Sequence, residues 1–132
     1  MFGMSVTIAD QTNQVSNAAD KAAFRNFAHA AARISKDAKA SIDKSTEPSS
    51  PGEPPHTRGR GGHNLRGAIR FNATKDDAVV GPIASFVGQA GAAHEFGGEF
   101  RDQVYPQRPF MWPALAANVD RFAKEWAGSI GE

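Results

Sequence analysis

The sequence predicts an α+β fold in which a long N-terminal helix and a C-terminal helix pack on a small antiparallel sheet. Two segments repeat apolar residues at the spacing of a helix face, shorter segments alternate apolar and polar residues, and a long Pro/Gly-rich loop lies between them. The chain has 132 residues, which is the size of a single domain, 1–132, with a modest core.

A short strand and a long helix are expected at the N-terminus. Residues 4–8 alternate apolar and polar side chains, which is typical of a strand. A helix is predicted over about residues 18–43, with Ser16 or Asn17 as its N-cap. Its apolar positions recur at spacings of three and four, and they are Phe24, Phe27, Ala28, Ala31, Ile34, Ala38 and Ile42.

Residues 46–63 are predicted to form an extended loop or arm, partly disordered in the free protein. Prolines remove backbone donors and disfavour helix at the residues before them, and glycines add flexibility. A loop of this length is unusual inside a compact domain and is commonly functional or ordered by a partner. We favour an arm that orders against a neighbouring subunit, with a solvated linker as the alternative. The residues behind this prediction are Pro48, Pro51, Gly52, Pro54, Pro55, Gly59, Gly61 and Gly62.

A hairpin and two short elements are expected next. Residues 64–73 form the first strand, residues 75–77 the turn, and residues 78–83 the second strand. Residues 89–95 form one or two helical turns that end at a Gly-Gly pair, and residues 100–108 supply another strand or an arm.

A C-terminal helix is predicted to begin at Pro113, because proline fits the first helical position, where its missing N–H group costs nothing. Gly128 is a natural stop. The apolar stripe of this helix consists of Leu115, Val119, Phe122, Ala123 and Trp126.

The composition excludes several classes of protein. The net charge of +1 gives no global attraction to nucleic acid, to a membrane or to acidic substrates. There is no cysteine, so disulfides and thiolate metal sites are excluded. No apolar run approaches the length of a membrane helix, and the N-terminus lacks the pattern of a secretory signal. We therefore expect a soluble protein.

Three patches stand in an ordered series along the chain. Residues 50–56 contain Pro-Gly-Glu-Pro-Pro and precede a Leu-Arg-x-x-Ile segment at residues 65–69. Residues 92–98 contain Glu-Phe-Gly, and residues 108–115 read Arg-Pro-Phe-x-x-Pro-Ala-Leu. In this order the patches resemble the tail-component, or tail-completion, family of long-tailed phages, which are small proteins encoded among the head–tail joining genes.

The resemblance implies a structural virion protein of the phage neck, without enzymatic activity, cofactor or metal. Such a protein would act by assembling into a homo-oligomeric ring, a hexamer or a dodecamer, that contacts neighbouring neck and tail proteins and lies near DNA in the channel. It would be assembled in the host bacterial cytoplasm and would not bind a membrane.

The residues expected at subunit or ring interfaces lie in the loop and in the later patches. Aromatic side chains are enriched at interfaces, which favours Trp112, whereas Phe110 and Met111 are expected in the core under the last helix. For Glu95 we favour a structural turn in which Phe96 packs into the core, with a contact at a ring interface as the alternative. The candidate interface residues are Pro51, Gly52, Glu53, Pro54, Pro55, His56, Arg58, Arg60, Glu95 and Trp112.

A basic segment runs from Arg58 to Lys75 without an acidic residue. It suggests an alternative function, a small nucleic-acid-binding protein, in which the phosphate contacts would be Arg58, Arg60, Arg66 and Arg70. Base stacking is poorly supported, since no aromatic residue precedes Phe71 in this segment. We favour a polar strand face with ion pairs between subunits.

His94, Glu95 and Glu99 superficially resemble a metal site. They lack a second histidine at helical spacing, so the usual zinc-hydrolase pattern is missing. A hydrolase is therefore the least favoured of the three hypotheses, and we predict no catalytic and no metal-binding residues.

Overall fold

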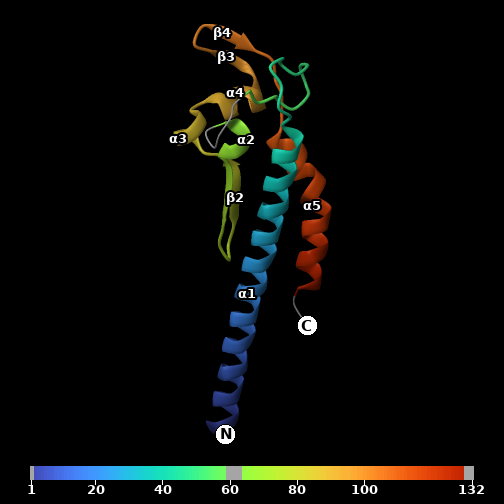
Figure 1. Cartoon of the computed structure of the whole chain (residues 1–132). Coiled ribbons are helices and arrows are strands. Elements are labelled where there is room, and N and C mark those ends of the chain that lie inside the picture. Colours follow the sequence, from blue (N-terminus) through green and yellow to red (C-terminus); the bar gives the residue numbers. More distant parts are fainter. Residues whose placement is uncertain (1, 59–63, 130–132) are drawn as a thin grey trace.

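The protein is an α+β structure, as predicted (Figure 1). The computed structural model describes residues 2–58 and 64–129. The elements in chain order are α1 (Phe2–Ser41), α2 (Leu65–Ala68), β1 (Ile69–Ala73), β2 (Ala78–Pro82), α3 (Ala84–Val87), α4 (Ala90–Phe96), β3 (Gly98–Phe100), β4 (Gln103–Tyr105) and α5 (Met111–Gly128).

Helix α1 begins much earlier than predicted. The strand expected at residues 4–8 is wrong, because this segment is helical and continuous with the rest of α1, so Ser16 and Asn17 lie inside the helix. No glycine or proline occurs between residues 4 and 47, so nothing interrupts the helix once it has formed. Adding a residue to an existing helix costs far less than starting a new element.

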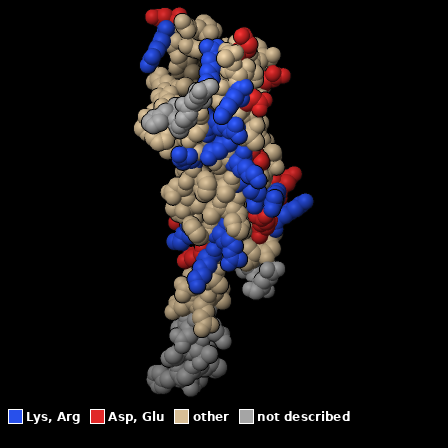
Figure 2. All heavy atoms as spheres, in the orientation of Figure 1, with Lys and Arg blue, Asp and Glu red and all other residues tan. Residues whose placement is uncertain are grey.

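Helix α1 lies between the β1–β2 hairpin and α5 (Figure 1). The predicted stripe is buried at Ala31, Ile34 and Ala38, whose small or compact side chains let the neighbouring elements approach closely. Phe24, which was expected in the stripe, is half exposed, whereas Ala22 and Asn26 on either side of it are buried, so Phe24 points away from the packed face of α1. On the face shown in Figure 2, Lys and Arg side chains gather in a column over α1.

The core is built around Phe110, which is 1% exposed. Its burial confirms the core position predicted for it, and Met111 packs against the same cluster while remaining partly buried. The other buried members of the cluster are Ile34, Ala38, Ile42, Leu65, Ile69 and Ala114.

The β1–β2 hairpin has the predicted turn but a shorter first strand. Instead of entering the strand at residue 64, the chain makes one turn of α2, in which the Asn64 side chain accepts a hydrogen bond from the N–H of Gly67 at 2.7 Å. The strands then pair antiparallel, with Ile69 opposite Pro82. An asparagine N-cap can hold a helical turn even in a segment whose apolar pattern favours a strand.

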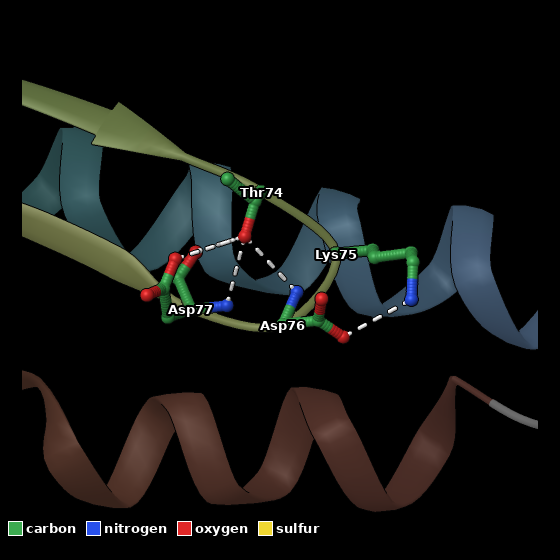
Figure 3. A network of polar contacts seen from close by, with 4 residues as sticks. All are labelled: Thr74, Lys75, Asp76 and Asp77. Carbon is green, nitrogen blue, oxygen red and sulfur yellow. Dashed lines mark hydrogen bonds and ion pairs between the residues drawn. The ribbon is translucent and has the colours of Figure 1, made fainter.

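The hairpin turn is held by Thr74 (Figure 3). Its Oγ1 accepts hydrogen bonds from the backbone N–H groups of Asp76 and Asp77 at 3.1 Å and donates one to Asp77 Oδ1 at 2.8 Å. Lys75 Nζ contacts Asp76 Oδ1 at 3.1 Å, and this contact raises the pKa of Lys75. A hydroxyl that bonds nearby backbone groups in this way favours a turn over a longer strand.

The second hairpin forms a sheet of its own, whereas the sequence predicted one sheet. Strands β3 and β4 pair antiparallel, and Arg101 and Asp102 between them both have positive φ angles, 51° and 63°. Two left-handed residues make the tight turn that matches strand twist. The predicted short helix is confirmed as α4, and it ends at Gly97 as expected.

Helix α5 begins at Met111, so Pro113 occupies its third position and not its first. Its packing face is also rotated relative to the predicted stripe. Ala114 and Asn118 are buried against α1, whereas Leu115 and Val119 are about half exposed. Asn118 donates to Asp37 Oδ2 on α1 at 2.8 Å, so a polar residue occupies the centre of this helix pair.

Two further contacts join the far half of α5 to α1. Phe27 packs against Phe122 and Trp126, with ring centroids 5.5 and 5.3 Å away. Arg33 donates two hydrogen bonds to the carboxylate of Glu125, at 3.1 and 3.0 Å. The Arg33 hydrogen bond holds the pKa of Glu125 below its usual value, and partial burial acts in the opposite direction.

Replacing Phe110 by alanine should lower the free energy of unfolding by about 3–5 kcal/mol, because the change leaves a cavity in the core. The matched control is Phe96→Ala, since Phe96 is 75% exposed, and it should cost less than about 0.5 kcal/mol. Urea denaturation of both variants measures the difference, and equal losses would contradict the assigned core.

The Arg33–Glu125 pair should make stability depend on pH. Because the folded pKa of Glu125 lies below its usual 4.5, the stabilisation is present above that value and is lost as pH falls through the folded pKa. The stability difference between the wild-type protein and Glu125→Gln should therefore be largest near neutral pH and shrink in acid, as measured by urea denaturation at several pH values. A difference that stayed constant into the acid range would show that the contribution of Glu125 does not depend on its negative charge.

The two arginines that contact Glu125 should contribute unequally. Arg121→Gln should lower the free energy of unfolding less than Arg33→Gln at neutral pH, because Arg121 is the more exposed partner, and urea denaturation would measure both variants.

Candidate interaction surface

The described part of the predicted arm, residues 46–58, is bonded to its own chain. Thr57 donates its N–H to Asp43 O at 2.8 Å and accepts from the N–H of Ser45 at 3.1 Å, so the two ends of the loop are joined. Pro55 is fully buried and His56 Nδ1 lies 2.8 Å from Glu47 O. The loop therefore has a structure before any partner is present.

The loop is also joined to the segment that precedes α5. Gly52 donates its N–H to Gln107 O at 2.8 Å, and Arg108 Nε donates to Ser49 O at 3.0 Å. The N–H of Arg108 reaches His94 O at 2.7 Å. These bonds bring the loop, the end of α4 and the start of α5 together, so three patches far apart in sequence become neighbours.

Glu95 is the centre of this junction. Its Oε2 accepts hydrogen bonds from the N–H groups of Phe110 and Met111, and its Oε1 accepts one from the N–H of Trp112, all at 2.9 Å. Phe110, at the N-cap position, makes no side-chain cap of its own. A carboxylate at this end of a helix is stabilised both by the free N–H groups and by the helix dipole.

Pro113 completes this arrangement. The first turn of a helix leaves N–H groups without helical partners. Glu95 bonds the N–H groups of the cap and of the first two helical residues, and Pro113 at the third position has no N–H. Glu95 and Pro113 together therefore leave no unpaired donor among these positions.

The turn after Glu95 requires a glycine. Gly97 has a φ angle of 64°, and a Cβ atom there would lie 2.9 Å from the backbone nitrogen of Gln107. Gln107 in turn donates from Nε2 to Glu95 O at 3.2 Å. The Glu-Phe-Gly patch is thus a structural unit that seats α4 against the start of α5.

Phe96 does not pack into the core as expected. It is 75% exposed, because it follows Glu95 by one residue and therefore points about 100° further round the helix. The Glu95 side chain points inward, toward the start of α5. The expected turn is confirmed at Gly97, but neither interpretation predicted that the Glu95 carboxylate caps α5 within its own chain.

Phe96 and Trp112 line an open apolar groove beside the junction. This groove has a volume of about 580 Å³ and is floored by Ile34 and walled by Val80 and Leu115. A second groove of about 420 Å³ continues from it and shares those three residues. We call the two together the apolar groove.

The predicted interface residues therefore separate into groups. Trp112 is 66% exposed, as an interface role requires. Pro51, Gly52 and Glu53 form an exposed tip of the loop. Pro55 is buried and Glu95 is bonded inside the chain, so neither is available to a partner in this conformation. Arg60 lies outside the described residues, and the remaining candidates, Pro54, His56 and Arg58, are at least partly exposed.

The basic segment is not one surface. Arg58 is exposed on the loop, Arg66 lies on α2 and Arg70 lies on β1. Arg70 and Phe71 are successive strand residues, so their side chains point to opposite faces of the hairpin. Within residues 2–58 and 64–129, none of these arginines pairs with a carboxylate.

His94 is half-buried, and no metal-like cluster surrounds it among the residues that the structure describes. Burial lowers its pKa, with a further contribution from Arg108. Its Nδ1 is buried and has no hydrogen-bond partner among the described residues. Both carboxylate oxygens of Glu95 are occupied by the cap, and in the described ranges no three His, Asp or Glu side chains converge as a metal site.

No family model matches the chain, and no curated protein or solved structure matches it significantly. The described helices include none with both the length and the hydropathy needed to cross a bilayer. The candidate surface is therefore defined by the contacts, exposure and charge of this chain alone.

Replacing Glu95 by alanine should lower the free energy of unfolding by about 2 kcal/mol, since three backbone donors lose a charged acceptor. Glu99→Ala is the matched control, because Glu99 is an exposed carboxylate on β3. Urea denaturation would measure both variants. If the two substitutions had equal effects, Glu95 would not be the cap that holds α5.

Proposed function

We propose that this protein is a structural component of the head–tail joint of a tailed phage, where it acts by oligomeric assembly and not by catalysis. The supporting observation is the meeting of three sequence patches at one junction, with Phe96 and Trp112 exposed beside an apolar groove. The order of those patches is the feature in which the sequence resembles the tail-completion family.

The geometry explains why the patches belong together. Residues 50–56 are bonded to Gln107, Glu95 caps α5, and Pro113 lacks the N–H that the cap would otherwise have to satisfy. The second and third patches therefore depend on each other for backbone hydrogen bonds, and the first patch is bonded to Gln107, the residue directly before the third. Because the patches are joined in this way, the three patches in their order are a stronger basis for the resemblance than any one of them alone.

The exposed apolar surface supports a role in assembly. Exposed apolar patches beyond the usual size on a monomer mark interaction surfaces, and aromatic side chains are enriched in them. Phe96 and Trp112 lie at one end of the apolar groove, and Val119 lines its other end. In a ring, this surface would be covered by a neighbouring copy or by an adjacent neck protein.

Electron microscopy of phage particles tests the proposal. Deleting the gene from the phage genome that carries it should leave DNA-filled heads separated from tails, and supplying the wild-type protein should restore joined particles. A double variant, Phe96→Ser with Trp112→Ala, should fold as judged by its thermal unfolding but should not restore joining, because it removes exposed apolar area and leaves the core intact.

The matched control is Phe24→Ser, which removes a half-exposed aromatic residue of α1 that does not line the apolar groove. This variant should restore joining. Joined particles in the deletion strain would refute the role in the head–tail joint. Restoration by the double variant would leave that role standing and exclude the apolar groove as the assembly surface.

A further inference from the structure

A separate groove on the other side of α1 carries only positive charge. Its volume is about 470 Å³, and three cations line it, Lys36 and Lys39 from α1 and Arg66 from α2. Phe71 of β1 and small α1 side chains complete the lining, and no acidic residue is among the described residues that line it. We call this the basic groove.

The three cations come from elements that the fold brings together. Lys36 and Lys39 are three residues apart, so they lie on one helix face. Arg66 follows the Asn64 cap by two residues, and α2 packs against α1. Neither lysine nor Arg66 pairs with a carboxylate within the part of the chain that the structure describes, so their charges are available to a ligand.

The positive charge continues along α1 beyond the groove. At helical spacing Lys21, Arg25, Lys36 and Lys39 fall within about 60° of the helix circumference, in a row about 27 Å long. Figure 2 shows the corresponding column of Lys and Arg side chains over α1. A row of cations with this spacing is suited to a linear polyanion and not to a single small anion.

Phe71 indicates that the ligand of the basic groove has flat rings as well as anionic groups. Its ring is 47% exposed although it lies beside buried Ser35 of α1, so it offers an apolar surface in the same groove as the three cations. A polymer of alternating anionic groups and flat rings would use both features. Single-stranded nucleic acid has this chemistry, because its phosphates pair with Lys and Arg while its bases stack on aromatic side chains.

We propose that the basic groove binds single-stranded nucleic acid, with Lys36, Lys39 and Arg66 on phosphates and Phe71 beneath a base. This inference does not depend on a role in the head–tail joint. A duplex hides its base faces, and an acidic peptide has no flat ring at each unit, so neither would use Phe71. The site differs from the basic segment that the sequence suggested, since two of its cations lie on α1.

Fluorescence anisotropy with a labelled oligothymidylate of about 20 nucleotides tests the proposal. The logarithm of the association constant should fall with the logarithm of salt concentration with a slope of about −2, because each of three phosphate contacts contributes about −0.7. Changing Lys36, Lys39 and Arg66 together to glutamine should abolish this slope and weaken binding at least about tenfold at low salt.

The stacking contact is tested by Phe71→Leu, which keeps apolar packing but removes the flat ring. Affinity for oligothymidylate should fall about tenfold, whereas affinity for an abasic oligomer of the same length should not change. A matched triple control changes Arg101, Arg121 and Lys124 to glutamine, three exposed cations that do not line the groove. This control should bind nearly as well as the wild-type protein.

Several results would overturn the proposal. Binding that fell equally in the control triple would mean general charge attraction. Equal affinity for a duplex, with no effect of Phe71→Leu, would assign the groove to phosphate contacts on double-stranded DNA. Tighter binding of an oligoglutamate peptide would assign it to an acidic protein partner. Failure of all probes to bind at low salt would remove the site while leaving the proposed structural role untouched.

Discussion

The carboxylate of Glu95 fixes the start of α5 relative to the end of α4. It is supplied by a short helix and used by the start of a long one, fifteen to seventeen residues later in the chain. Phe110, the largest fully buried side chain among the described residues, has its backbone N–H as one of the three donors to that carboxylate. The cap therefore positions the centre of the core, the axis of α5 and the exposed Trp112 by one set of bonds.

The long helices and the first hairpin could be predicted because their patterns are repeated over several turns or closed by a turn sequence. The error at residues 4–8 shows the limit of a short pattern, since five alternating residues fit a strand until the absence of any breaker before Pro48 is considered. Helix α3 and the separate β3–β4 sheet escaped prediction because elements of three or four residues show no period.

The sequence could predict which residues belong to the candidate site, but not how they contact one another. The sequence singled out Glu95 and Trp112, yet it could not assign the Glu95 carboxylate to a helix start in another patch, because that bond is non-local. The exposure of Phe96 follows from the inward direction of Glu95, and the basic groove follows from packing of α2 on α1. Pro113 was a clue to the cap. Proline is tolerated in the first turn of a helix, and because it has no N–H group, only three N–H groups there remain for a capping side chain to bond.

Helix α1 has 40 residues and α5 has 18, so the first turns of α1 extend past the rest of the body, and the side chains of residues 13–18 are exposed (Figure 1). A helix segment without tertiary packing is marginal in water when it is shorter than about 12–15 residues. The helicity of this extension is therefore coupled to whatever covers it. Any oligomer that buries the extension would make the far-ultraviolet circular dichroism of the protein increase with its own concentration.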